Sequence, residues 1–594
     1  MIFNKPKHVI FFALCIVATS FFFMVFLKQR NYQDLWILDG IVVPTAIFIF
    51  FFLAAETFAK ENKTLVVLAA FLLAAMNVVP GLKYQLFSNV YDAPAHYRFT
   101  DQIASLGYIP ENEPPLSRTY GGNPGMHIFM ASISIISGIS TNDVFRFVIP
   151  ALSGLVPFIV YFITKDILDD STQRYVIIAS SFPIIQRFAI YGTGLAILPY
   201  FMLIAVYIRC MFTKKNQGAF WFIFAILSFN IIISHAITSL FFAFILVGTL
   251  VVLKSLEFAR NKPLGQMRAS QLVAPCLFYV VLLSAWWGSI SSFNLNRFAV
   301  YIGQAFEGDP YHATVPSRFH EMSFLLKLQV LMVEHLRDGI LAMLSLLGIL
   351  VFIRKLRRNE ASDKVKTFYL FLIVLLSMFA LFLSFEFASG FGSIEYGRFI
   401  AYALPLCTFL IGLALWQLSK FLQRIFVKPM IRNLTFATIL FMLISLSLIQ
   451  FYRCQPLIPR SNVLSSDLPE NEYLYYFGTV NTIYQVEMIS FAEMHSYNGS
   501  IASDTVTRFQ IRGFSSPSFS SRHLYYRQFY RSPLEPNHTL EWDLLLLHTL
   551  RAGALNEKAE YRTRERIENI RLEAGNIIYD NGESFIIAHF PHNP

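Results

Sequence analysis

Acid, imidazole and guanidinium groups stand close together in the stretch 91–107, YDAPAHYRFTDQIASLG. Asp92 and His96 are four residues apart, so they share one face if the stretch is helical, whereas Arg98 and Asp101 lie elsewhere around the turn. Carboxylates and imidazoles exchange protons in catalysis, and guanidinium groups bind phosphate. The alternative interpretation is structural: the proline two residues after Asp92 fits the first turn of a helix, and Asp92 then takes the N-cap position.

The composition assigns the chain to a class of protein. Of its 594 residues, 55% are hydrophobic and only 14% are charged, whereas soluble domains carry about 25% charged residues. A polytopic membrane protein is therefore predicted. The net charge of +10 comes from basic residues in short links between apolar runs, which is typical of topology signals, so no nucleic-acid partner is expected. The five cysteines show neither a disulfide framework nor metal-binding spacing.

The apolar runs predict an all-α core of about thirteen membrane-spanning helices, counting roughly 20 residues for each crossing. The first run is interpreted as a retained helix rather than a signal peptide, because no clear small-residue cleavage site follows it. The expected spans are 8–27, 36–59, 64–82, 144–164, 174–190, 194–212, 219–236, 238–254, 271–291, 336–354, 367–387, 397–419 and 433–450.

One short apolar segment, Met126–Ile139, decides the predicted topology. Its length is nearer that of an interfacial or re-entrant helix than that of a span. If it does not cross, the later basic links all fall on the side of Lys5 and Lys7; if it crosses, they all face the other side. The positive-inside rule therefore predicts a non-spanning segment in a multi-pass plasma (inner) membrane protein, with a cytoplasmic N-terminus and an extracytoplasmic C-terminus.

Three regions are then expected outside the membrane: the loops 83–143 and 292–335, and the tail 451–594. The tail is polar enough for a small α/β domain, and its segment NIIYDNGESFIIAHF predicts a β-hairpin that turns at Asp-Asn-Gly. The chain is accordingly divided into two N-terminal spans (1–63), a transmembrane core (64–450) and this tail domain. The sequence contains no P-loop, dinucleotide fingerprint, HExxH or CxxC motif.

The stretch DAPAHYRFTDQIASLG resembles the first external-loop signature of oligosaccharyltransferase catalytic subunits and related GT-C glycosyltransferases. In those families an aspartate is followed by His at plus four, Arg at plus six, an acid at plus nine and Gly at plus fifteen. The matching positions are Asp92, His96, Arg98, Asp101 and Gly107. The likeness continues more loosely over most of the chain, and it implies a GT-C membrane core with an amphipathic external loop and a C-terminal domain.

Two parts of the family pattern are missing. The segment QRFAIYGTG carries Arg187 but not the second acidic pair that the family often has there. The WWDYG motif that oligosaccharyltransferases use to hold the acceptor sequon is absent, because Trp542-Asp543 is followed by Leu544. No cofactor is therefore certain: a divalent cation such as Mg²⁺ or Mn²⁺ stays open, with Asp92 as the only candidate ligand that has support, and a protein acceptor is disfavoured.

The resemblance implies that a sugar moves from a polyprenyl-phosphate donor to a glycan, lipid or protein acceptor at the extracytoplasmic membrane face. Asp92 is expected to act as the general base. Arg398 is the first choice and Arg187 the second for binding the leaving phosphate, with interfacial anchoring as the alternative role of each. His96 is expected to position Asp92 or to bind a metal.

Four further residues are expected to contribute to substrate binding. Arg98 and Asp101 belong to the signature, and Glu395 is a weaker candidate. His235 either reaches the same cavity or pairs with a neighbouring hydroxyl or backbone group. Three other functions stay open: an oligosaccharyltransferase with a degenerate acceptor motif, a flippase for lipid-linked sugars, and a non-catalytic envelope-assembly protein that would tolerate the loss of Asp92.

Overall fold

The computed structural model of the chain divides into two compact units. The helical unit comprises Met1–Val79, Gly122–Met126 and Ile149–Phe451, and the mixed unit comprises Pro80–Gly121, His127–Val148 and Tyr452–Pro594. The residues that the structure describes are 62–83, 93–110, 122–182, 192–212, 217–260, 270–292, 294–296, 324–358, 362–388, 396–427, 435–436, 439–440, 483–494, 501–503, 523–525, 544–548, 576–580 and 584–588.

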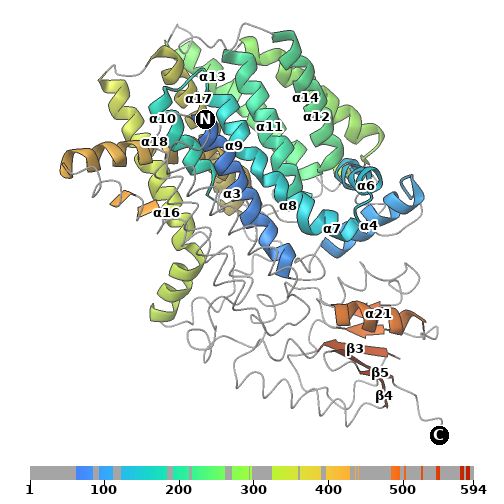
Figure 1. Ribbon diagram of the computed structural model, residues 1–594. Helices are drawn as coiled ribbons and strands as arrows, with labels where there is room; N and C mark the ends of the chain where they lie inside the picture. The colour runs from blue at the N-terminus through green and yellow to red at the C-terminus, as the bar shows by residue number, and fades with distance from the viewer. Residues whose placement is uncertain are drawn as a thin grey trace, which may run out of the picture. The chain divides into compact units, whose positions relative to one another are not determined.

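The described part of the helical unit is built from helices (Figure 1). They are α3 (Asn62–Lys83), α8 (Ile149–Ala151), the 3₁₀ turn η3 (Leu152–Gly154), α9 (Leu155–Thr164), α10 (Asp170–Ser180), α11 (Gly192–Phe212), α12 (Gln217–Ser234), α13 (Ala236–Arg260), α14 (Ser270–Ser289), α16 (Phe324–Arg357), α17 (Asp363–Ala388) and α18 (Tyr396–Ile425).

Six helical segments in the described residues are long and apolar enough to cross a membrane. They are Thr141–Thr164, Gln217–Ser234, Ala236–Ala259, Leu272–Ser289, Gly339–Arg357 and Pro405–Ile425. Each coincides with a predicted span, so the membrane class of the chain is confirmed. The predicted total of thirteen and the orientation of the termini stay predictions, and the spans 8–27 and 36–59 lie outside the described residues.

Helices α10 and α16 both pack along α18. Glycines permit this close packing. A Cβ atom on Gly412 of α18 would lie 2.5 Å from the Cα atom of Val176 in α10, and one on Gly348 of α16 would overlap the backbone of Leu410 in α18. Small residues let helix backbones approach closely, which is the usual way in which membrane helices associate.

One end of the helical unit is held together by charged and polar side chains. Arg209, near the end of α11, donates a hydrogen bond to Asp166, which follows α9. Trp416, near the end of α18, donates to Ser171 at the start of α10, and Asn62 at the start of α3 bonds to the same region of α10. We call this the basic end, defined by Asn62, Asp166, Ser171, Arg209 and Trp416.

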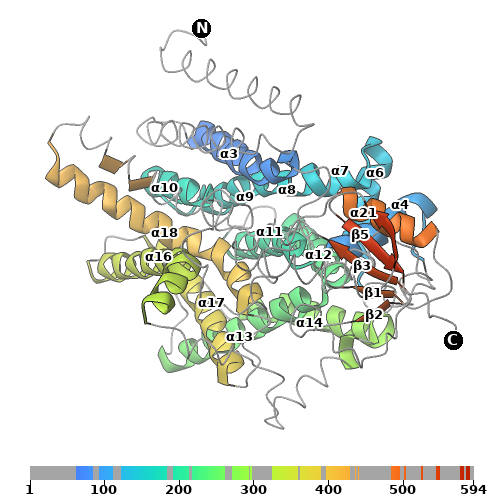
Figure 2. The same ribbon diagram turned by 90° about the horizontal axis from the view of Figure 1, so that it is seen from below.

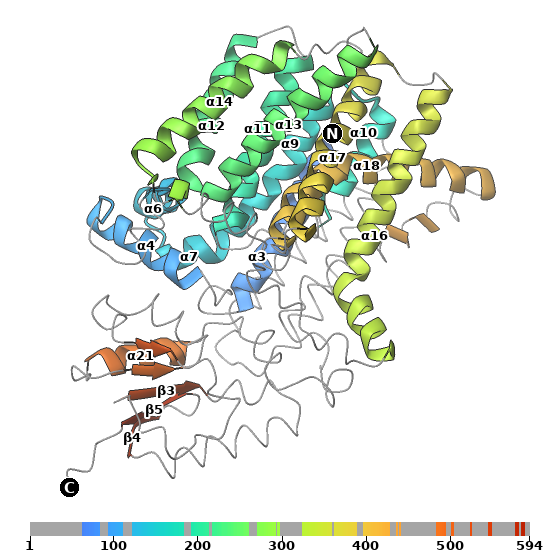
Figure 3. The same ribbon diagram turned by 180° about the vertical axis from the view of Figure 1, so that it is seen from behind.

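The opposite end is held by uncharged groups. Asn123 donates from Nδ2 to the carbonyl oxygen of Ile232 in α12 and accepts at Oδ1 from Ser291, which follows α14. Thr238 of α13 hydrogen-bonds to Tyr402 of α18. We call this the neutral end, defined by Asn123, Ile232, Thr238, Ser291 and Tyr402. Figure 3 shows α12 and α14 running side by side along the unit, in agreement with their mutual contacts.

The described tail of the mixed unit forms a single sheet with strand order β2-β1-β3-β5-β4. The strands are β1 (Ile501–Ser503), β2 (His523–Tyr525), β3 (Leu544–His548), β4 (Asn576–Asp580) and β5 (Ser584–Ala588). Strand β1 is parallel to its neighbours, whereas β5 is antiparallel to β3 and β4. Helix α21 (Ile483–Met494) contacts β3, β4 and β5 (Figure 2). Strands β4 and β5 pair antiparallel, as the predicted hairpin requires, whereas most of its turn, residues 581–583, lies outside the described residues. The extent of a tail domain stays a prediction.

Candidate functional site

The signature stretch forms helix α4 (Ala93–Leu106) in the mixed unit. The helix begins directly after position 92, as an aspartate at the N-cap and a proline in the first turn predict. Asp92 itself lies outside the described residues. Gly107 ends the helix with a backbone φ of +75°, and its N–H donates to the carbonyl oxygen of Ile103 at 2.9 Å. Glycine adopts this left-handed conformation without steric penalty. The glycine at plus fifteen therefore has a physical reason, which is to end the helix.

His96 is buried on the inner face of α4, against helix α6 (Gly125–Ser137). Its Nδ1 atom lies 2.8 Å from Nε2 of His127, and the two imidazoles are stacked with an interplanar angle of 23°. His127 has no exposed surface, and its ring meets Phe99 edge to face. Because a hydrogen bond between two imidazoles needs one donor and one acceptor, the contact fixes complementary protonation at the facing nitrogens. His127 is absent from the predicted site residues.

The rest of α4 separates an apolar face from a polar one. Phe99 and Ile103 pack on Ala131 of α6 and form the small core that orients the helix. Arg98 is largely buried, whereas Asp101 is exposed. Burial raises the pKa of Tyr97 to about 12, and the charge of Asp101 adds to the effect. Of the two predicted binding residues on this helix, the structure places only Asp101 at the surface.

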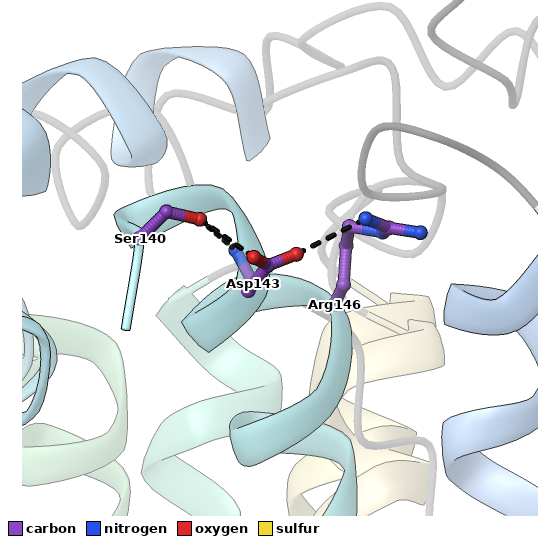
Figure 4. A network of polar contacts seen from close by, with 3 residues as sticks. All are labelled: Ser140, Asp143 and Arg146. Atoms are coloured by element: carbon purple, nitrogen blue, oxygen red, sulfur yellow. Dashed lines mark hydrogen bonds and ion pairs between the residues drawn. The ribbon is translucent and has the colours of Figure 1, made fainter. Parts of the chain in front are cut away.

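A capped turn follows α6 and starts the next helical segment (Figure 4). Ser140 caps α7 (Thr141–Asp143), accepting from the N–H of Asp143 at 3.1 Å while its hydroxyl donates to the Asp143 carboxylate at 2.9 Å. Arg146, in the π-helical turn η2 (Val144–Val148), donates to the other carboxylate oxygen at 3.0 Å. Since α4 also contacts α7, this network fixes one of the surfaces on which α4 packs.

At the neutral end of the helical unit, the segment Gly122–Met126 contacts two helices. The amide of Asn123 donates to the Ile232 carbonyl at 2.6 Å, in the last turn of α12, and Trp286 of α14 donates to the Gly122 carbonyl at 2.9 Å. A Cβ atom on Gly125 would lie 2.6 Å from the Ile233 side chain. Glycine is therefore needed at position 125 for close approach, and Asn123 satisfies a carbonyl near the end of a helix.

His235 occupies the single-residue break between α12 and α13. Its Nδ1 lies 2.7 Å from the Thr238 hydroxyl, which in turn hydrogen-bonds to the Tyr402 hydroxyl. Position 398 precedes Tyr402 by one helical turn on α18. The backbone therefore brings the predicted positions 235 and 398 to the same end of the helical unit, although the side chain of Arg398, like the residues Arg187 and Glu395, is not among those described.

The described residues do not form a cation site. They contain no group of three or more His, Cys, Asp or Glu side chains that could hold a metal ion. The facing nitrogens of His96 and His127 are 2.8 Å apart, which is a hydrogen-bonding distance and leaves no space for an ion between them. These residues therefore do not fit a divalent cation, and the predicted ligand Asp92 lies outside the described part of the chain.

No protein-family model and no curated protein matches the chain. Among solved structures, it is similar to the oligosaccharyltransferase of Archaeoglobus fulgidus tethered with an acceptor peptide containing the NVT sequon (TM-score 0.48, 13% identity, 90% of this chain and 75% of that chain). It is also similar to that enzyme in the apo form (0.47, 12%, 90% and 75%). A third is the archaeal oligosaccharyltransferase AglB from the same organism in complex with an inhibitory peptide and a dolichol-phosphate (0.46, 13%, 89% and 74%). These structural neighbours belong to the family whose signature the stretch 91–107 resembles.

Proposed function

We propose that the chain is a GT-C type glycosyltransferase that moves a sugar from a polyprenyl-phosphate carrier to an acceptor at the extracytoplasmic membrane face. The observation that carries the proposal is the match between the bounds of helix α4 and the spacing of the signature. Its start falls directly after Asp92, its buried face holds His96, and its left-handed stop is Gly107. The fixed spacing of the signature thus corresponds to a single helix that starts directly after Asp92, in a chain that also has membrane-length helices.

The proposed reaction assigns one role to a carboxylate and one to a cation. An acceptor hydroxyl or amide attacks the anomeric carbon of the sugar, and the bond from that carbon to the phosphate oxygen breaks. The acceptor proton moves to the Asp92 carboxylate, and the polyprenyl phosphate leaves with the electron pair of the broken bond. Arg398 binds the departing phosphate through its planar guanidinium, with Arg187 as the second candidate for this role.

Two other predicted residues are proposed as positioning residues. His96 is held by His127, so it fixes the first turn of α4, which follows position 92 directly in the chain. At the neutral end, the chain of hydrogen bonds from His235 through Thr238 to Tyr402 fixes the α18 turn that follows position 398. Arg98 and Asp101 are proposed to contact substrate from α4, and Glu395 from the segment before α18.

The test is glycosyl transfer in membranes that contain the wild-type chain or Asp92→Asn, with a panel of radiolabelled polyprenyl-phosphate sugars. Removal of a general base lowers a rate by about 10²–10⁴-fold, so Asp92→Asn is expected to lose at least about 100-fold of the transfer at unchanged protein level. Asp363→Asn, which removes an exposed acid at the start of α17, is the matched control and should retain transfer. Equal transfer by wild type and Asp92→Asn would contradict the role of Asp92.

Two further arms of the same assay separate the alternatives. A chelator tests the divalent cation, which is required only if transfer stops on its addition and returns with Mg²⁺ or Mn²⁺. A peptide with an Asn-x-Thr sequon tests the oligosaccharyltransferase alternative, which gains if the peptide is glycosylated. Transport of the donor across the bilayer by Asp92→Asn as fast as by wild type, without any transfer, would favour a flippase.

A further inference from the structure

The basic end of the helical unit holds two ammonium groups against one indole ring. Nζ of Lys355, near the end of α16, lies 3.8 Å from the centroid of the Trp416 ring, and Nζ of Lys420 lies 3.9 Å from it. The two charges are therefore closer to each other than the Debye length of about 8 Å at physiological salt, so dissolved ions screen their repulsion only in part. Such an arrangement is stabilised by an anion that neutralises both charges.

The ring that both ammonium groups approach is fixed in place. Trp416 is 8% exposed, and its indole N–H donates to the Ser171 hydroxyl at 3.2 Å. Ser171 donates in turn to the carboxylate of Asp169, which caps α10. Asp169 supplies one negative charge near Lys355, whereas the last turns of α16 and α18 add Arg354, Arg357 and Arg424 to the two lysines. The last turns of these two helices thus carry five basic residues.

The outer face of α18 joins this charge to an apolar surface. Lys420 and Arg424 are exposed and lie one turn apart. Phe421 and Ile425, which follow each of them directly, are 54% and 51% exposed. The two basic side chains thus form one exposed stripe and the two apolar side chains a neighbouring exposed stripe at the end of a membrane-length helix. A free anion would contact only the basic residues, whereas a phospholipid has a phosphate for the basic residues and acyl chains for the apolar ones.

We propose that the cluster of Lys355, Trp416 and Lys420 binds the phosphate headgroup of an anionic membrane phospholipid, whose acyl chains contact Phe421 and Ile425. The lysine ammonium groups approach the phosphate oxygens, and the indole holds the ammonium groups apart in a fixed geometry. The site is independent of the glycosyl-transfer proposal, because its residues lie at the basic end and none belongs to the predicted catalytic or substrate-binding set.

The experiment uses the purified full chain in detergent, mixed with phosphatidylglycerol and phosphatidylcholine, with the bound lipids counted by native mass spectrometry. We expect about a tenfold preference of the wild-type chain for phosphatidylglycerol, since each lysine near an anionic lipid contributes several-fold. Lys355→Gln/Lys420→Gln should reduce this preference to about one, whereas Lys355→Arg/Lys420→Arg, which keeps both charges, should retain it. Lys254→Gln/Lys364→Gln removes two other exposed lysines and is the control that should bind as wild type does.

Several results would overturn the proposal. An unchanged preference in Lys355→Gln/Lys420→Gln would show that the lipid binds elsewhere, and an equal loss in the control pair would show that only the total charge matters. If inorganic phosphate displaces phosphatidylglycerol from the wild-type chain at equal concentration, the occupant is a free anion. If Lys355→Gln/Lys420→Gln does not fold, the salt dependence of lipid binding by the wild-type chain still tests the proposal. A phosphatidylglycerol preference that does not fall with added salt excludes the charged site.

Discussion

The two ends of the helical unit solve the same structural problem, the joining of helix ends, with different chemistry. At the basic end, Arg209 and Asp166 form an ion pair, and cations of α16 and α18 gather around Trp416. At the neutral end, the described contacts run through amide and hydroxyl groups, with Asn123 bonded to the Ile232 carbonyl and to Ser291. The comparison teaches where charge is tolerated: long basic side chains at the membrane surface keep their charged heads in water or beside lipid phosphate.

The neutral end has a different requirement. The break at His235 interrupts the helical hydrogen bonding between α12 and α13, so carbonyl groups there need other donors. An amide such as that of Asn123 provides a donor without adding charge. The charges that the proposed reaction uses are therefore expected from the predicted residues Arg187, Glu395 and Arg398, not from the groups that hold the helices together.

The largest effect is expected at the ion pair of the basic end. The Arg209 side chain is 5% exposed and that of Asp166 is 58% exposed, and Nε and Nη1 of Arg209 have no hydrogen-bond partner in the described structure. Asp166→Ala leaves a buried cation unpaired and should lower the free energy of unfolding by about 3 kcal/mol. Arg209→Met removes the buried charge and leaves an exposed carboxylate, so about 1 kcal/mol is expected.

Denaturant unfolding in detergent micelles measures both variants. The asymmetry is the informative quantity, because an ion pair that stabilised the fold through mutual attraction alone would lose the same free energy whichever partner was removed. A larger loss for Arg209→Met than for Asp166→Ala would show that packing of the guanidinium on Phe162, where the ring centroid is 5.0 Å away, outweighs the unpaired charge.

A smaller effect separates the two asparagines that join helix ends. Asn123 is 3% exposed, so Asn123→Ala leaves the Ile232 carbonyl buried without its donor and should cost about 2 kcal/mol of unfolding free energy. Asn62 is half-buried at the basic end, where it donates to Oε1 of Gln173 at 3.0 Å and accepts from Nε of Arg174 at 2.8 Å. Because water reaches this position more readily than Asn123, Asn62→Ala should cost about 1 kcal/mol. Thermal unfolding of both variants tests the difference, and equal losses would contradict the distinction between the ends.

The sequence predicted those features that depend on local order. The aspartate before α4, the proline in its first turn and the glycine after it predicted the start and the stop of that helix, and the length of Met126–Ile139 predicted a short helix where α6 runs from Gly125 to Ser137. The adjacent spans 219–236 and 238–254 likewise correspond to α12 and α13. Hydropathy and turn residues act over a few positions, which is why such features can be read from neighbours in the chain.

Contacts between distant residues could not be predicted in the same way. His127 lies in an apolar helix with no charged neighbour to mark it, and its partner His96 is 31 residues away. Asn123 lies in a Gly-Asn-Pro-Gly turn, which predicts a loop but not that its amide bonds to α12, 109 residues further on. The only available signal was composition: a lone histidine in an otherwise apolar thirteen-residue helix needs a polar partner when buried.

The smallest expected effect is a pH dependence at the basic end. Burial alone would raise the pKa of Asp169, but the hydrogen bonds from Ser171 and Thr172 and the charge of Lys355 outweigh it and lower the pKa below its ordinary value. A lowered pKa in the folded state means that the stability contributed by the Asp169 carboxylate is fully present above the unfolded value of about 3.9 and is lost as the pH falls through the lower folded-state value.

Asp169→Asn should therefore melt at a lower temperature than the wild type near neutral pH, and the two melting temperatures should converge as the pH falls below about 4. Ser171→Ala removes one of these hydrogen bonds. Its melting temperature should therefore differ less from that of the wild type near neutral pH, and this difference should also shrink as the pH falls. A difference in melting temperature between Asp169→Asn and the wild type that does not change with pH would show that Asp169 acts only as a helix cap. Its charge would then not stabilise the basic end.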